Sequence, residues 1–149
     1  MKEFFTRERA NEGVKLPLYH PDGTTSEHWL LVRGVDSDSF RRTETKSKQR
    51  VVELLALPDD NTREEKISEV EIDCIASLVA DWSFPQELTH EAVVSFLTEA
   101  PQIREQVNSF AARRSVFFAK KLKPSTAGSR KKSSSKKDQQ VQKSQSGIT

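Results

Sequence analysis

The sequence has little cysteine, little glycine and no long apolar run, and each shortage excludes a class of protein. Cys74 is the only cysteine, so no disulfide forms within the chain and nothing indicates an oxidising compartment. Five glycines are too few for a phosphate-cradling loop, and no nucleotide-binding or nucleophile-elbow motif is found. No apolar stretch approaches the roughly 18 residues of a membrane span or forms a signal peptide. We therefore expect a cytoplasmic protein.

Charge is divided unevenly along the 149 residues. Residues 120–149 carry nine basic residues and one acidic residue, a net charge of +8, whereas residues 1–119 carry 15 basic and 21 acidic residues, a net charge of −6. The C-terminal segment is rich in Lys, Ser and Gln, and its hydrophobicity is too low to offset the entropy lost on ordering. We predict a folded domain over 1–119 and a disordered Lys/Ser/Gln-rich tail over 120–149.

The first predicted element is a short helix over residues 2–12. Gly13 tolerates the left-handed conformation that ends many helices. Phe4 and Phe5 would anchor this helix to the domain. A helix this short is marginal by itself, so it must dock or fray.

A β-hairpin is predicted next. Two partly alternating apolar segments, 16–19 and 29–32, flank a Pro-Asp-Gly turn signal at 21–23. Pro17 has no N–H to donate, which predicts that its strand lies at the edge of a sheet or is broken at this position. We expect Gly34 to end the second strand.

From residue 36 the pattern becomes helical. One long, largely exposed helix is predicted over about 37–57 and a second over roughly 63–82. The second helix has an apolar stripe with three- and four-residue spacing: Ile67, Val70, Cys74, Leu78 and Trp82. Thr89 predicts the cap of a short helix, and Pro101 fits the first position of a last helix. That last helix carries Ile103, Val107, Phe110, Ala111, Phe117 and Phe118.

These elements define the expected fold class, which is mainly α with some β (α+β). An N-terminal β-hairpin packs on four to five helices, and the disordered basic tail follows them. The sequence has no internal repeat, and a length of 149 residues is typical of one domain.

No constellation of residues indicates catalysis or a metal site. The three histidines, His20, His28 and His90, are too few for zinc, although the first two would meet across the hairpin. Cys74 lies on an apolar stripe and is interpreted as a small buried hydrophobe. The carboxylates of 64–73 follow the solvent side of a helix. We therefore expect no enzyme, no metal and no cofactor.

Aromatic residues are the candidates for binding a partner, although each also has an interpretation as a core residue. We favour the core for Trp82 because it continues the apolar stripe, whereas exposure would make it a binding hot spot. The aromatics near the tail have the same two interpretations. The predicted partner-binding residues are Trp82, Phe84, Phe110, Phe117 and Phe118.

The basic tail has two interpretations. Lysines among serines bind phosphates without sequence preference. However, the segment 120–149 has no aromatic residue to stack on bases, and its charge would equally attract an acidic partner or another copy. A solvated tail that keeps the chain soluble is the simplest interpretation, so nucleic acid is not the expected partner.

Three motifs stand in order along the domain. The first is Leu-Pro-Leu-Tyr, Pro-Asp-Gly-Thr, His-Trp-Leu, Gly-Val-Asp-Ser-Asp and Phe-Arg over residues 16–41. The second is Asp-Trp-Ser-Phe at 81–84. The third is Glu-Ala-Pro-Gln-Ile-Arg-Glu-Gln-Val at 99–107, closed by Phe-Ala-Ala-Arg-Arg at 110–114 and by Phe-Phe at 117–118. In order and spacing, these motifs resemble the tail assembly chaperones of long-tailed bacteriophages over roughly residues 14–119.

The resemblance implies a function that the residues alone do not give. Members of this family act in the host cytoplasm, where they bind the tape measure protein, keep its hydrophobic helices soluble and recruit the tail tube protein. They are not kept in the mature virion. Many have a longer form made by ribosomal frameshifting, and the basic runs Arg-Lys-Lys at 130–132 and Lys-Lys at 136–137 fit slippery codons. We expect a homo-oligomer or multi-copy binding, because amphipathic helices offer an apolar groove to helical partners.

Two other hypotheses stay open. One is a nucleic-acid-binding accessory protein that acts through the tail, and deletion of the tail would abolish that binding alone. The other is a minor structural tail protein, such as a tube or terminator subunit. Such proteins are usually β-rich, whereas this sequence predicts one hairpin.

Overall fold

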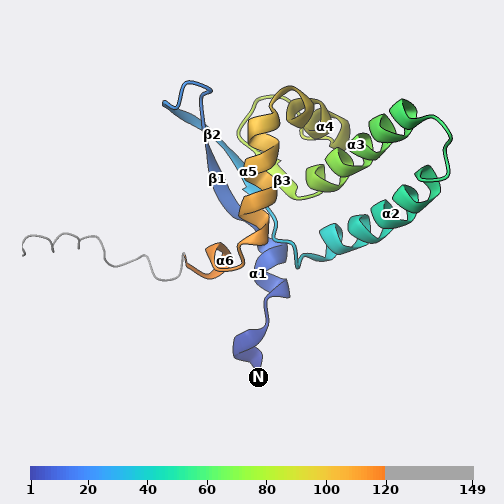
Figure 1. Ribbon diagram of the computed structural model, residues 1–149. Helices are drawn as coiled ribbons and strands as arrows, with labels where there is room; N and C mark the ends of the chain where they lie inside the picture. The colour runs from blue at the N-terminus through green and yellow to red at the C-terminus, as the bar shows by residue number, and fades with distance from the viewer. Residues whose placement is uncertain (120–149) are drawn as a thin grey trace, which may run out of the picture. The chain divides into compact units, whose positions relative to one another are not determined.

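The computed structural model describes residues 1–119, so the predicted disorder and role of the tail lie outside the described residues. Met1–Phe117 form one compact unit, and a second unit begins at Phe118. The elements follow in the order η1 (Lys2–Phe4), α1 (Arg7–Glu12), β1 (Val14–Tyr19), β2 (Thr25–Val32), α2 (Asp38–Leu54), α3 (Asp60–Ala76), β3 (Val79–Trp82), α4 (His90–Glu99), α5 (Pro101–Ala112) and α6 (Val116–Ala119) (Figure 1). The predicted mainly α fold with an N-terminal hairpin is confirmed.

The hairpin of β1 and β2 is built by its turn. The backbone N–H of Thr24 donates to Asp22 Oδ1 at 3.0 Å, and Gly23 takes a φ of 91°, which L side chains rarely adopt. Pro17 of β1 lies opposite Trp29 of β2. The sheet has the order β1-β2-β3, so β1 is an edge strand. The predicted turn and edge position are therefore confirmed, and the second strand ends at Val32 instead of Gly34.

The strand β3 corrects the predicted helix over 63–82. The helix ends at Ala76, and β3 pairs antiparallel with β2 so that Trp82 lies opposite Leu30. Ser77 helps to end the helix, because its hydroxyl donates to the Cys74 carbonyl at 2.6 Å. Backbone groups of β2 need partners on its second side, and β3 supplies them. The spacing of the predicted stripe did not distinguish a helix from this strand.

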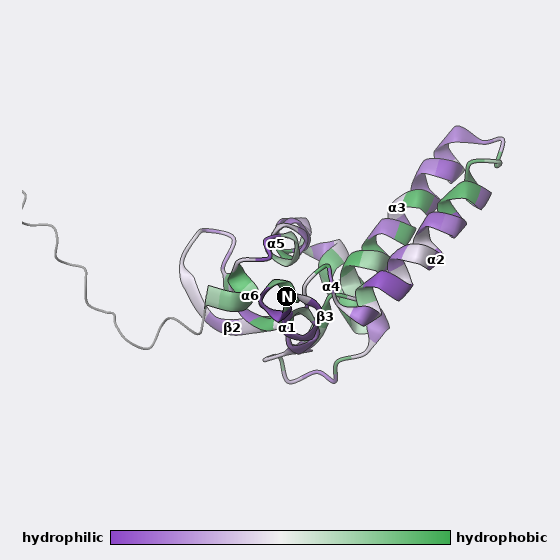
Figure 2. Ribbon diagram, turned by 90° about the horizontal axis from the view of Figure 1, so that it is seen from below, coloured by the Kyte–Doolittle hydropathy of each residue, from purple (hydrophilic) through white to green (hydrophobic). Residues whose placement is uncertain are grey.

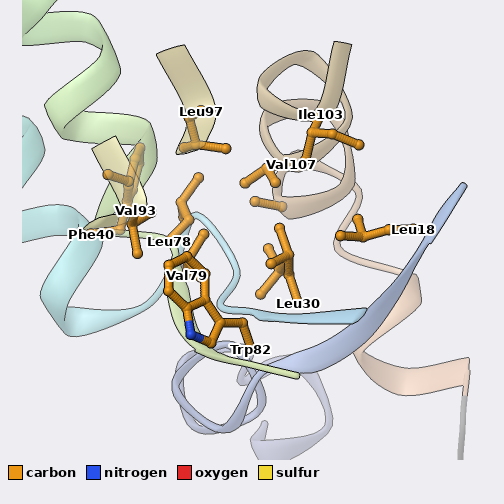
Figure 3. Packing of buried hydrophobic residues seen from close by; sticks show 13 residues of the cluster. Leu18, Leu30, Phe40, Leu78, Val79, Trp82, Val93, Leu97, Ile103 and Val107 are labelled. Atoms are coloured by element: carbon orange, nitrogen blue, oxygen red, sulfur yellow. The ribbon is translucent and has the colours of Figure 1, made fainter. Parts of the chain in front are cut away.

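The core lies between the sheet and the helices α3, α4 and α5. Figure 3 shows Leu30 of β2 and the residues of β3 facing Leu97 of α4 and Val107 of α5. Thr89 Oγ1 accepts from the Ala92 N–H at 3.1 Å and caps α4, and Pro101 opens α5. Both predicted helix starts are confirmed.

The helices α2 and α3 form a hairpin of largely hydrophilic helices (Figure 2). The helix predicted over about 37–57 is α2, which spans Asp38–Leu54. Asp59 caps α3, because its carboxylate accepts from the Thr62 N–H at 2.9 Å. Val52 and Leu55 lie exposed near the end of α2. The long exposed helix is therefore confirmed with slightly shorter bounds.

Both terminal helices differ from the prediction. Residues 2–12 are divided into η1 and α1, and Phe4 is 78% and Phe5 59% exposed, so neither anchors the helix. Ala10 holds α1 instead, because its carbonyl accepts from the Gly34 N–H at 3.0 Å. A Cβ added at Gly34 would lie 3.0 Å from Ala10 Cβ, so glycine permits this close approach.

The predicted last helix is also interrupted. Arg113 has φ −87° and ψ 92°, which is extended backbone, and it separates α5 from α6. Consequently Phe117 does not share a helix with Phe110. Near the end of α5, the Ala111 carbonyl has no partner within the helix and accepts instead from the Val35 N–H at 3.1 Å. Val35 is distant from Ala111 in sequence.

Asp36 joins the start of α2 to the segment after α5. Its carboxylate, in a side chain only 15% exposed, accepts from Arg114 Nε at 2.6 Å and from Arg41 at 3.0 Å. Hydrogen bonds from Arg114 first, and then from Thr6 and Arg41, hold the pKa of Asp36 far below its usual value of 3.8, against the raising effect of partial burial. The ionised form is therefore the stabilising one.

This depressed pKa predicts a pH dependence of stability. The contribution of Asp36 is fully present above its unfolded pKa of about 3.9 and is lost as the pH falls through the lower folded pKa. Urea unfolding between neutral and acid pH should show this loss. Asp36→Asn should cost about 1–3 kcal/mol at neutral pH and flatten the acid part of the profile. Arg114→Gln should also flatten the acid part of the plot of unfolding free energy against pH. If both variants keep the slope of the unmodified protein, Asp36 is not the cause of the acid loss of stability.

Candidate functional site

Four aromatic side chains, from the elements β2, β3 and α4 and from the loop after β3, gather on one side of the domain. The ring of Phe84, in the loop after β3, lies 4.7 Å from His28 of β2, 5.3 Å from Trp82 and 5.1 Å from Phe96 of α4, measured between ring centroids. Trp82 and Phe96 meet edge to face at 6.1 Å. These edge-on and tilted geometries are favourable for aromatic rings. We call the surface around Phe84 and Phe96 the aromatic groove.

The loop that carries Phe84 is fixed by its neighbours. The Ser83 N–H donates to the Trp29 carbonyl at 3.2 Å, and Ser83 Oγ accepts from the Trp29 N–H at 2.9 Å. His28 Nδ1 lies 3.1 Å from the same Oγ, and the Trp82 indole N–H donates to the Gln86 carbonyl at 2.8 Å. Phe84 therefore stands on a preformed loop, half-buried, with part of its ring open to solvent.

Two hollows share Phe84 and Phe96 as lining residues. The first, of about 380 Å³, is completed by Trp82, Gln86, Ala92 and Ser95. The second, of about 370 Å³, extends over the hairpin and the α4–α5 junction, where its lining includes Leu18, Tyr19, His20, Pro21, His28, Glu99, Gln102 and Ile103. Most of these groups are apolar, and the polar ones can stay solvated at the rim. Such a groove fits apolar side chains of a partner.

Phe110 and Phe117 form a separate pair, with ring centroids 6.0 Å apart. Phe117 is only 3% exposed and lies against Gly34, where an added Cβ would come within 3.2 Å of its ring. Phe110 is half-buried and lines a smaller hollow of about 260 Å³ beside Leu16 and Arg113. Phe117 is therefore a core residue in this unit, and Phe110 reaches its surface.

The structure thus divides the predicted partner-binding residues. Trp82 and Phe84 come together at the aromatic groove, with Trp82 itself 8% exposed. Phe110 and Phe117 form the separate pair described above. Phe118 is half-exposed on α6 and belongs to the second unit.

Sequence reasoning did not select Phe96 or His28 for the site. The signal for Phe96 was present, because Ala92 and Phe96 repeat the four-residue spacing of the buried Val93 and Leu97 one residue earlier. This second row widens the apolar face of α4 beyond what the core needs. His28 gave no comparable signal, since its place beside Phe84 depends on the pairing of β2 with β3.

The other polar residues singled out from the sequence are dispersed. Burial raises the pKa of the half-buried Cys74 thiol, which disfavours the thiolate. His90 Nε2 lies 3.1 Å from Asp73, on the surface between α4 and α3. In the segment 1–119, no group of three or more His, Cys, Asp or Glu side chains could hold a metal ion, and none of the helices there is long and apolar enough to cross a membrane. Comparisons with protein-family models, curated proteins and solved structures found no match.

Proposed function

We propose that this protein is a tail assembly chaperone of a long-tailed bacteriophage and that it binds the tape measure protein in the aromatic groove. One observation carries the proposal: the motifs behind the resemblance also build the groove. Trp82 and Phe84 come from the second motif, and Glu99, Gln102 and Ile103 from the third. Two motifs separated in sequence thus line one continuous apolar surface.

The shape of the groove suits a helical client. Apolar side chains three or four residues apart on one helix face lie about 5–6 Å from each other. Two hollows that share Phe84 and Phe96 can receive two such side chains from one amphipathic helix. The groove would then cover the client's apolar face and keep it from aggregating.

Affinity for one client site should be modest. Apolar burial contributes about 25 cal/mol per Å², and most of this gain is offset by the loss of freedom on binding. Several copies along one long client would hold it by avidity, which agrees with the expected multi-copy binding. This function needs burial of apolar surface and no catalytic group, so we propose a binding protein and not an enzyme.

The same proposal includes the setting of the chaperone. It would act in the host cytoplasm, recruit the tail tube protein to the coated client and be released before the virion is complete. A frameshifted longer form would add a second function to the same domain.

Fluorescence of Trp82 tests the proposal, because its ring lines the first hollow. In the full chain with Trp29→Phe, the emission of Trp82 should change saturably when amphipathic helical peptides from the tape measure protein of the same genome are added. A scrambled peptide of equal composition, without an apolar stripe, should give no saturable change. If overlapping peptides that cover the entire tape measure protein leave the emission unchanged, the groove is not the client site.

A further inference from the structure

Residues 1–5 form an arm that presents two aromatic rings to solvent. Phe4 is 78% and Phe5 59% exposed. The backbone that carries them is nevertheless ordered, since the Phe4 N–H donates to the Met1 carbonyl at 3.1 Å and the Phe5 N–H to the Lys2 carbonyl at 3.0 Å. Neighbouring apolar rings on an ordered, exposed segment mark a surface that contacts another molecule.

The arm lies away from the groove of its own chain. In Figure 1, η1 lies beyond α1 near one end of α5, whereas α4 and the α4–α5 junction lie at the other end. The helix α1 is fixed there by the hydrogen bond from Gly34 to Ala10 and by Arg9, whose guanidinium donates to the Phe117 carbonyl at 3.2 Å. Because the arm and the groove lie at opposite ends of α5, a groove that receives the arm belongs to a different molecule.

We propose that the arm of one copy docks in the aromatic groove of a second copy. The arm offers two exposed rings, and the groove offers two adjacent hollows of about 380 and 370 Å³. Lys2 of the arm and Glu99 on the rim carry opposite charges. The two surfaces are different parts of the same chain, so the contact is head to tail. A copy bound through its arm keeps a free groove, and further copies can add in line.

The size of the contact sets its strength. Two phenylalanine side chains bury about 150–250 Å² each, whereas stable interfaces bury about 1,200–2,000 Å² in total. The contact is therefore weak and reversible, and it forms mainly where copies are concentrated. If the groove also binds the client, as proposed above, a docked arm and a client helix exclude each other from one groove, and this consequence alone depends on the proposed function.

Sedimentation velocity of the full chain over a concentration series tests the contact without any client. The sedimentation coefficient of the unmodified protein should rise with concentration. Phe4→Ser/Phe5→Ser should lower the association constant about tenfold or more, because it removes both anchoring rings. Ser95→Arg should do the same by placing a charge in the groove from an exposed position of α4. Ser68→Arg, an equal change at an exposed position of α3, should associate like the unmodified protein.

Mixing the two defective variants identifies the geometry. The Ser95→Arg chain keeps its arm and the Phe4→Ser/Phe5→Ser chain keeps its groove, so an equimolar mixture should form one-to-one dimers that do not grow. Three results would overturn the proposal: an unmodified protein that stays monomeric at every concentration, an arm variant that associates normally, or a mixture without dimers. None of them involves the client, so they leave the client-binding proposal to its own test.

Discussion

Replacing Leu97 by alanine should lower the free energy of unfolding by about 2–5 kcal/mol. Leu97 is 0% exposed and lies where α4 faces Leu78 and Val107 across the core (Figure 3). The substitution removes buried apolar surface and leaves a cavity that the two neighbouring layers cannot fill without moving. Because domains of this size are stable by about 5–15 kcal/mol, the change is a large fraction of the total.

Urea unfolding followed by circular dichroism measures this loss as a lower midpoint with an unchanged slope. Leu55→Ala is the matched control, since it removes the same atoms from a side chain that is 59% exposed at the end of α2. It should change the free energy of unfolding by less than about 0.5 kcal/mol. Equal losses in the two variants would contradict the position of the core between α4, α5 and the sheet.

Replacing Phe84 by serine should weaken client binding about tenfold or more. Phe84 lines both hollows of the aromatic groove, and the backbone of its loop is held by hydrogen bonds of Ser83 and Trp82. Loss of the ring therefore removes apolar contact area from the proposed client site while the loop keeps its backbone contacts. The dissociation constant for the tape measure peptide with the largest response in the Trp82 titration is the quantity to compare.

Phe110→Ser provides the control, because it makes the same substitution at another half-buried phenylalanine. Phe110 lines the smaller hollow beside Arg113. That hollow shares Gln102 with the aromatic groove but none of the rings that line the groove. We expect its client affinity to stay within about threefold of the unmodified protein, a difference of less than about 0.7 kcal/mol. Weakening as large as that of Phe84→Ser would extend the client site to this second hollow.

The predictions made from local signals agree with the structure. Gly23 in the hairpin turn, Thr89 at the start of α4 and Pro101 at the start of α5 act through their own backbone conformation or that of near neighbours. Such residues constrain the chain wherever the element is placed. The hairpin, the helix starts and the mainly α class could therefore be predicted from sequence.

Two of the errors, the missed strand β3 and the missed break at Arg113, have one physical cause, which is contact between segments distant in sequence. The strand β3 forms because the backbone groups on one side of β2 need hydrogen-bonding partners, and β3 supplies them. The buried residues of β3, Val79 and Trp82, are three residues apart, a spacing that also fits a helix. The break at Arg113 lies beside the hydrogen bond between Val35 and Ala111. The partner of β3 is β2, and the partner of Ala111 is Val35. The residue spacing within residues 63–82 and 101–118 indicates neither partner.

The candidate site follows the same division. Trp82 and Phe84 are close in sequence, so the proximity of their rings was predictable from an aromatic pair around a serine. Phe96 and His28 join them only after β2 pairs with β3 and α4 packs beside that strand pair. The exposure of Phe4 and Phe5 was the opposite of the expected anchoring, and it is the observation on which the arm contact depends.

Co-expression of the full chain with the tape measure protein of the same genome tests the central claim most directly. Soluble yield of the tape measure protein and co-elution of the two chains are measured with the unmodified protein and with Phe84→Ser. The account predicts that the unmodified protein makes the tape measure protein soluble and co-elutes with it in several copies, and that Phe84→Ser largely loses both effects. An insoluble tape measure protein, with this protein eluting alone, would contradict the proposed function.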